Sequence, residues 1–182
     1  MNFAFVFPGQ GSQSVGMMAA YGDSAVIRET FAEASAALGE DLWQMVADGP
    51  AELLAQTVNT QPLMLTAGIA VYREWIARGG AVPALVAGHS LGEYSALVAA
   101  GALDFQDAVK LVRLRAQAMQ EAVPQGEGAM AALLGLDEAQ AVEACAEAAQ
   151  GDVVSAANLT SPGQIAIARS RAAVERAIVA AN

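Results

Sequence analysis

Cysteine, histidine and lysine are each present only once in this chain, and each scarcity excludes some classes of function. Its one cysteine, Cys145, excludes an internal disulfide and is typical of a cytoplasmic setting. One histidine and one cysteine far apart in the chain provide no ligand cluster for a metal. Only one lysine is present, and the net charge of −10 argues against a nucleic acid partner.

Long uncharged runs are also missing. Although 55% of the residues are hydrophobic, no run approaches the roughly 18 uncharged residues that a membrane span requires. Residues 1–8 carry no basic side chain and read as the start of a strand, so we expect no secretory signal, no membrane partner and a cytoplasmic protein. A length of 182 residues fits one domain, or one domain with a small appendage.

The most informative motif lies within residues 84–100. A short apolar run stops at Gly88, Ser90 follows in the pattern G-x-S-x-G, and a helical pattern rich in alanine and leucine begins after it. Strand, sharp turn and helix are the context of a nucleophile elbow. Gly88 and Gly92 let the two backbones pass closely, and the helix start offers N–H groups to a developing negative charge. The motif therefore predicts that Ser90 is a nucleophile that accepts an acyl group.

Other stretches predict the elements around this motif. A buried strand is expected at residues 3–7, and Gln10 follows it either in a plain turn or aimed at a substrate. Asn59–Pro62 reads as a turn before a helix at residues 63–77. Arg113 and Arg115 lie on a helix expected at residues 104–119, and because they are two residues apart they cannot share a face. We expect one of them to point inward.

The pattern changes near residue 125. The order after it is strand, helix, strand, strand, helix, which matches a split β-α-β fold without its last strand. We therefore predict an α/β protein with two parts. Residues 1–125 form a large, hydrolase-like domain with a parallel sheet that is incomplete at its C-terminus, and residues 126–182 form a small ferredoxin-like subdomain.

Five stretches in the same order carry a resemblance to a known family. They are residues 7–13 (FPGQGSQ), 60–62 (TQP), 88–96 (GHSLGEYSA), Arg115 in its helix, and 128–130 (GAM). In these stretches the chain resembles the malonyl-CoA:acyl carrier protein transacylases of fatty-acid synthesis, and specifically their N-terminal part.

The resemblance implies a role for several residues. Ser90 would take a malonyl group from malonyl-CoA as an ester and pass it to the phosphopantetheine thiol of acyl carrier protein, with no cofactor in the enzyme itself. Gln10 and the backbone N–H of Leu91 match oxyanion-hole positions, and Arg115 matches the arginine that binds the malonyl carboxylate, where a guanidinium fork fits better than lysine. Gln61 and Asn158 match positions that line the pocket.

The chain departs from that family in its catalytic base. The family uses a histidine from a later segment to activate the serine. The only histidine here, His89, is adjacent to Ser90, and adjacent side chains point to different sides. We expect His89 to be structural, with a hydrogen bond beneath the elbow. A C-terminal segment beyond residue 182, or a second chain, is expected to supply the base and to cover sheet edges and apolar surface left open.

Three functions stay open on this evidence. The first is a malonyl transacylase that is complete only with a further segment. The second is a truncated, non-catalytic fragment that binds acyl groups or takes part in assembly. The third is a serine esterase or thioesterase, which requires an acid and a histidine later in the chain. Lys110 and Arg113 are candidates for a basic patch facing the acidic carrier protein, or are simply solvated charges.

Overall fold

The computed structural model describes residues 2–122 and 126–181. The chain divides into two compact units, Met1–Met119 and Gln120–Asn182. The boundary predicted at residue 125 falls on residues outside those described, so the division into 1–125 and 126–182 stays a prediction. The two units are considered separately below.

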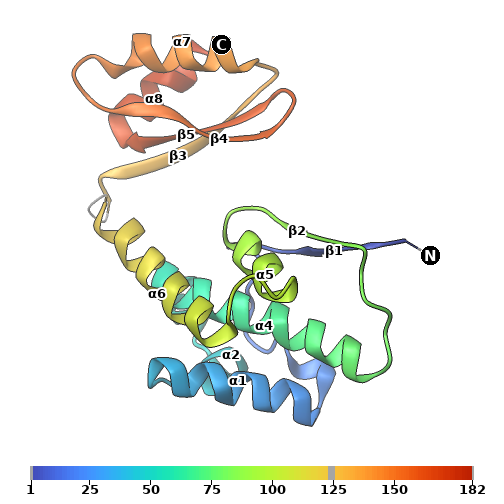
Figure 1. Ribbon diagram of the computed structural model, residues 1–182. Helices are drawn as coiled ribbons and strands as arrows, with labels where there is room; N and C mark the ends of the chain where they lie inside the picture. Colours follow the sequence, from blue (N-terminus) through green and yellow to red (C-terminus); the bar gives the residue numbers. More distant parts are fainter. Residues whose placement is uncertain (1, 123–125, 182) are drawn as a thin grey trace. The chain divides into compact units, whose positions relative to one another are not determined.

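The first unit combines a small parallel sheet with helices (Figure 1). Its elements in chain order are β1 (Ala4–Phe7), η1 (Ala19–Tyr21), α1 (Ala25–Leu38), α2 (Leu42–Asp48), α3 (Ala51–Ala55), α4 (Thr57–Ala77), β2 (Leu85–Gly88), α5 (Leu91–Ala99) and α6 (Phe105–Glu121). The strand predicted at residues 3–7 corresponds to β1, and the helix predicted at residues 104–119 corresponds to α6, each within a few residues.

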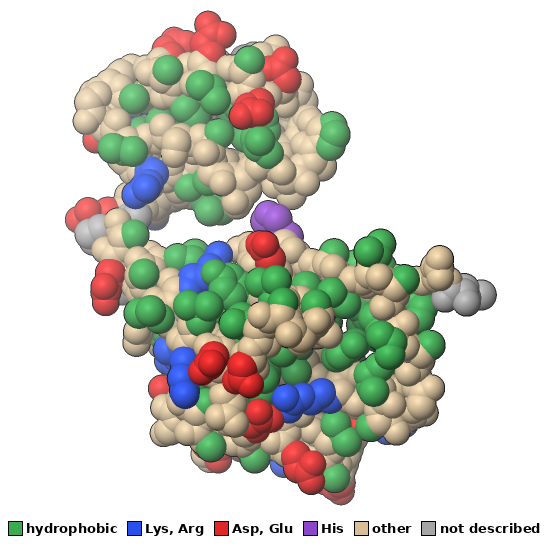
Figure 2. Space-filling model, viewed as in Figure 1, with side chains coloured by type: hydrophobic (Ala, Val, Ile, Leu, Met, Phe, Trp, Pro, Cys, Tyr) green, Lys and Arg blue, Asp and Glu red, His purple; other side chains and the backbone are tan. Residues whose placement is uncertain are grey.

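The sheet of this unit consists of β1 and β2, paired in parallel with Phe7 opposite Gly88. Side chains alternate along β1, so Phe5 and Phe7 face α4, where the Phe5 ring lies 5.5 Å from the ring of Tyr72. Val6 points the other way and is 73% exposed. Figure 2 shows hydrophobic side chains at the surface of this unit around these strands. The predicted uncovered apolar surface is therefore confirmed.

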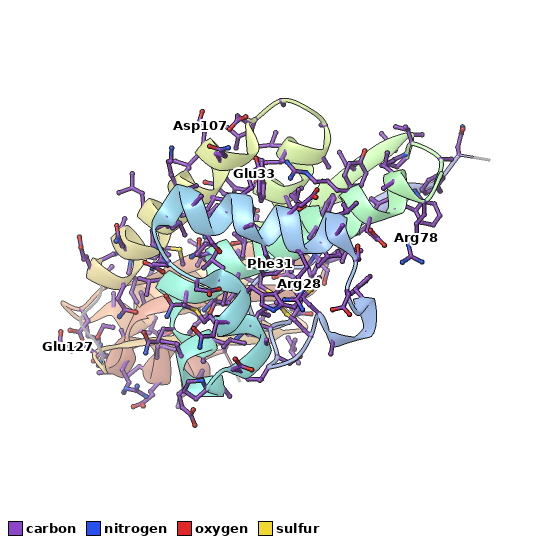
Figure 3. All side chains as sticks on the ribbon, turned by 90° about the horizontal axis from the view of Figure 1, so that it is seen from below. Arg28, Phe31, Glu33, Arg78, Asp107 and Glu127 are labelled. Carbon is purple, nitrogen blue, oxygen red and sulfur yellow. The ribbon has the colours of Figure 1, made fainter. Side chains whose placement is uncertain are left out.

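Helix α4 lies between this sheet and α1 (Figure 1). Along α1, the residues at helical spacing that face the core are fully or almost fully buried, Phe31 among them. The Phe31 ring meets Trp43 of α2 edge to face at 5.2 Å, and the guanidinium of Arg28 stacks 3.7 Å from the centre of the same indole (Figure 3). These contacts fix α2 against α1.

The start of α4 differs from the prediction. The expected turn at Asn59–Pro62 is wrong, because the helix already begins at Thr57 and includes Pro62. Pro62 is the sixth residue of this helix, so the helix lacks the hydrogen bond that an N–H there would donate to the carbonyl of residue 58. Polar side chains also bond to carbonyls of the preceding segment: Asn59 Nδ2 donates to Leu53 O at 3.0 Å, and the Thr60 hydroxyl donates to Leu54 O. The polar residues that resembled a turn are buried helix residues.

The second unit is a three-stranded antiparallel sheet covered by two helices. Its elements are β3 (Gly128–Leu134), α7 (Glu138–Ala149), β4 (Val154–Ser161), β5 (Gln164–Ser170) and α8 (Arg171–Ala180), with strand order β3-β5-β4. Asp137 and Gln140 form a capping box at the start of α7. Cys145 is buried in the core of this unit, and burial raises the pKa of its thiol. This fits a small core residue.

Among the helices that the structure describes, none combines the length and the apolarity needed to cross a bilayer.

Candidate active site

The predicted elbow has the backbone that its motif requires. Ser90 stands between β2 and α5 with φ of 54° and ψ of −111°, a conformation that non-glycine residues rarely adopt. Its side chain is exposed rather than packed. Strain of this kind persists where the surroundings enforce it, and it is concentrated at functional sites.

The two glycines of the motif let β2, α5 and the end of β1 approach closely. A Cβ atom on Gly88 would lie 2.1 Å from the carbonyl carbon of Gly92. A Cβ atom on Gly92 would lie 2.3 Å from the carbonyl oxygen of Phe7. Because both obstacles are backbone atoms, neither can rotate away. The first turn of α5 therefore sits directly on the carboxyl end of β1.

The helix that follows Ser90 presents donors to the site. Leu91 is the first residue of α5, and N–H groups in the first turn of a helix have no intrahelical acceptor. The N–H of Gly92 bonds back to His89 O at 2.9 Å, which closes the turn. The start of α5 thus carries partial positive charge beside the Ser90 hydroxyl.

Arg115 reaches this hydroxyl from α6. Its Nη2 donates to Ser90 Oγ at 3.0 Å, and its Nη1 donates to Gln61 Oε1 at 2.7 Å. The guanidinium also lies 5.6 Å from the ring centre of Tyr94. The structure therefore brings together three predicted site residues from α4, the elbow and α6. Of the two arginines two residues apart, Arg115 is the one directed to the elbow.

Gln61 is held in one orientation. Its side chain is fully buried, and its Nε2 donates to the sulfur of Met119 at 3.3 Å while its oxygen accepts from Arg115. A buried amide with both ends occupied has little freedom to rotate. The family resemblance indicated a pocket position for Gln61, but nothing in the sequence indicated its contact with Met119, which is 48% exposed.

Gln10 lies in the loop after β1. Its amide donates to Thr57 Oγ1 at 3.2 Å, a contact that the sequence did not suggest. The neighbouring Gly9 approaches the elbow, since a Cβ atom there would lie 3.4 Å from His89 O. The loop and the elbow are thus neighbours, while the oxyanion roles of Gln10 and Leu91 stay predictions.

Two further expectations concern residues outside this group. The His89 side chain is exposed, and its imidazole makes no hydrogen bond within residues 2–122 and 126–181. The prediction of a structural hydrogen bond beneath the elbow is therefore wrong. Asn158 lies in β4 of the second unit, half-buried beside a register shift. Its pocket role stays a prediction.

No group of three or more histidine, cysteine or carboxylate side chains in the described part of the chain could hold a metal ion. Arg113, a candidate for a basic patch, is instead engaged with Glu40 in an ion pair of 2.5 Å. Lys110 is exposed on the same helix.

The fold and site together define an α/β protein with a serine at a nucleophile elbow and a guanidinium bonded to that serine. A family model, described as the acyl transferase domain, matches residues 4–181. The chain belongs to this family.

Individual relatives are more specific. The chain is 62% identical over 176 residues to the malonyl CoA-acyl carrier protein transacylase of Escherichia coli K12, and 49% identical over 177 residues to that of Bacillus subtilis 168. These alignments cover 96% of this chain but 57% and 55% of the relatives. The chain thus spans little more than half the length of these relatives.

Solved structures of malonyltransferases are also similar to this chain. The acyl-carrier-protein S-malonyltransferase of Burkholderia pseudomallei has a TM-score of 0.91 and 60% identity, with 100% of this chain and 59% of that chain covered. The structure of a type II PKS acyl-carrier protein in complex with its malonyl-transacylase contains a second similar chain. Its TM-score is 0.92 and its identity 54%, and the alignment covers 100% of this chain and 59% of that chain.

Proposed function

We propose that this chain carries the acyl-accepting part of a malonyl-CoA:acyl carrier protein transacylase of fatty-acid synthesis, working in the cytoplasm. The observation that carries the proposal is the 3.0 Å hydrogen bond from Arg115 Nη2 to Ser90 Oγ, in a guanidinium whose other nitrogen is held by Gln61. It places a fixed cation next to the atom that would bear the acyl group.

The first half of the reaction uses Ser90 as nucleophile. Its Oγ attacks the thioester carbonyl of malonyl-CoA and loses its proton to a base, and the oxyanion accepts hydrogen bonds from the Leu91 N–H and the Gln10 amide. Collapse of this intermediate breaks the carbon–sulfur bond, and CoA leaves with a proton. Attack on the ester by the phosphopantetheine thiol of acyl carrier protein then forms the new thioester and restores the hydroxyl.

Arg115 accounts for the choice of acyl group. In a malonyl ester, one methylene group separates the free carboxylate from the ester carbonyl. A guanidinium within hydrogen-bond distance of Oγ can therefore bind this carboxylate through two of its N–H groups. An uncharged acyl group of the same size leaves this cation without an anionic partner. Asn158 would line the same pocket.

The base is proposed to come from a part of the protein beyond this segment. The one imidazole of the chain, His89, makes no hydrogen bond to Ser90 in the described part, and relatives of this chain are considerably longer. For the same reason a second candidate is kept, in which this segment alone binds acyl groups without turnover.

The same longer protein would complete the fold. We propose that the first unit is a hydrolase-like parallel-sheet domain and that residues 126–182 are a ferredoxin-like subdomain without its last strand, which the order β3-β5-β4 and the helices α7 and α8 support. A C-terminal segment, or a second chain, would add strands to both sheets.

Mass spectrometry tests the proposed function directly. After incubation with malonyl-CoA, the peptide that contains Ser90 should gain one malonyl group, and holo-acyl carrier protein should remove it. Ser90→Ala is the matched control and should stay unmodified. An unmodified Ser90 both in this chain and in a full-length enzyme that carries it would contradict the proposal. Modification only in the full-length enzyme would support the second candidate for this segment.

A further inference from the structure

Two arginines of α6 meet two amide side chains at the start of α4. Arg113 Nη1 donates to Asn59 Oδ1 at 3.3 Å, and Arg115 Nη1 donates to Gln61 Oε1 at 2.7 Å. Both pairs are 54 residues apart in the chain. The contact between α6 and the first turns of α4 therefore consists of two side-chain pairs. We call them the first rung (Arg113 and Asn59) and the second rung (Arg115 and Gln61), and only the second rung contacts the elbow.

The first rung is anchored away from the elbow. Arg113 Nη2 donates to Glu40 Oε2 at 2.5 Å, and Glu40 lies in the short loop between α1 and α2. Asn59 in turn donates through Nδ2 to Leu53 O of α3 at 3.0 Å. A chain of hydrogen bonds from Glu40 through Arg113 and Asn59 to Leu53 thus connects α6 to the loop after α1 and to the helices α4 and α3.

The Arg113 side chain is only 15% exposed, against 41% for Glu40. Its Nε is buried and finds no acceptor among the described residues. A buried N–H without an acceptor costs free energy. An apolar side chain at this point would avoid that cost, so stability alone is a poor reason for an arginine here. A geometric role for the guanidinium accounts for it better.

We propose that Arg113 is a positioning residue: clamped between Glu40 and Asn59, it fixes α6 on α4 so that the guanidinium of Arg115 lies where a substrate carboxylate must bind. This inference rests on the proposed role of Arg115 in recognising malonyl groups. A bidentate contact between guanidinium and carboxylate depends on orientation, and small misplacements of such a group lower its contribution sharply. Loss of the clamp should therefore reduce the selectivity for malonyl groups while Ser90 chemistry with uncharged groups continues.

The experiment is a competition between malonyl-CoA and acetyl-CoA for Ser90 in a full-length enzyme that carries this chain. Arg113→Met, and separately Glu40→Gln, should lower the preference for malonyl over acetyl by about five- to thirtyfold, through a higher KM for malonyl-CoA, because a misplaced group loses up to about a hundredfold. The rate of acetylation should stay near that of the unmodified enzyme.

Glu33→Gln is the matched control. Glu33 forms an ion pair of 2.6 Å with Arg73, and both side chains are about one-third exposed. This pair joins α1 to α4, and Glu33 Oε1 also accepts a long hydrogen bond of 3.4 Å from Gln106 Nε2 at the start of α6, but it touches neither rung. The control should keep the malonyl preference, with a thermal midpoint lowered about as much as in Glu40→Gln. Should Arg113→Met fail to fold, Glu40→Gln decides the question, since its side chain is the more exposed partner.

A double-mutant cycle separates positioning from a general loss of stability. In an Arg115→Ala background, Arg113→Met should cause no further loss of malonyl preference, because it acts through Arg115. Two results would overturn the positioning role and leave the proposed function standing. One is an additive loss of malonyl preference in the double variant. The other is an unchanged preference in Arg113→Met and in Glu40→Gln, while Arg115→Ala loses its preference. A preference that survives Arg115→Ala would instead overturn the proposed role of Arg115 itself.

Discussion

At the scale of single residues, the proposed chemistry depends on a contact between two side chains that are far apart in sequence. Arg115 lies on α6 and Ser90 lies in the turn before α5, 25 residues earlier, yet their side chains are hydrogen-bonded. Gln61 accepts from the guanidinium and so orients it, and the amide nitrogen of Gln61 donates to the Met119 sulfur. A planar, fixed cation of this kind suits a planar carboxylate better than a flexible ammonium does.

Replacing Arg115 tests this contact. Arg115→Lys keeps the charge but loses the fork, so it should lower the preference for malonyl-CoA over acetyl-CoA by about tenfold, and Arg115→Ala by about a hundredfold, in line with about 1.5–3 kcal/mol for a charged hydrogen bond. The measurement is the competition assay in a full-length enzyme. Equal preference in Arg115→Lys and the unmodified enzyme would show that charge alone matters.

At the scale of elements, α1 and α4 are joined at the start of α1. Ser24 caps α1 by accepting from the Ile27 N–H at 3.4 Å, and its hydroxyl donates to Glu74 Oε2 of α4 at 2.7 Å. The hydrogen bond from Ser24, and after it the contact with Arg78, holds the pKa of Glu74 below its ordinary value of 4.5. Since the folded state favours the ionised form, Glu74 stabilises the fold above pH 4.5, and this contribution is lost as the pH falls through the lower folded-state pKa.

Glu74→Gln tests this pH dependence. The variant should be less stable than the unmodified chain at neutral pH, and the difference should shrink as the pH falls below 4.5, because Gln has no proton to gain. Urea unfolding at neutral pH and at a pH below 4.5 measures this difference in the free energy of unfolding. Glu29→Gln, a change at an exposed carboxylate of α1, serves as the control and should keep the acid-side loss of the unmodified chain. A constant difference across the range would contradict the assignment.

At the scale of the whole molecule, the first unit has a sheet with too few strands for its type. Parallel sheets are normally covered on both faces, yet Val6 and Leu85 on the face away from α4 are 73% and 71% exposed. Covering two such side chains would contribute about 2 kcal/mol each. This surface fits the observation that relatives of this chain are longer.

The segment should therefore bind hydrophobic dyes and self-associate when it is studied alone. Val6→Thr combined with Leu85→Thr should reduce dye binding and the associated fraction in size-exclusion chromatography, with little change in the thermal midpoint, because neither side chain is packed. A stable monomer that binds no dye before any substitution would contradict the role given to this surface.

The sequence by itself determined the elements and the elbow. Gly88 and Gly92 around Ser90 specified a turn that only small residues permit, and the residue pattern specified β1, α6 and the order of elements after residue 125, because these signals are local. The turn expected at Asn59–Pro62 was wrong, since the side chains of Asn59 and Thr60 are buried and donate to carbonyls of the preceding helix, which a local turn pattern does not reveal. Spacing alone left open which arginine of α6 points inward, and the family resemblance indicated Arg115. Only the tertiary structure decided that Arg115 bonds to Ser90 and that Arg113 is held by Glu40, because that depends on how α6 packs against α4, and residues 54 positions apart set that packing.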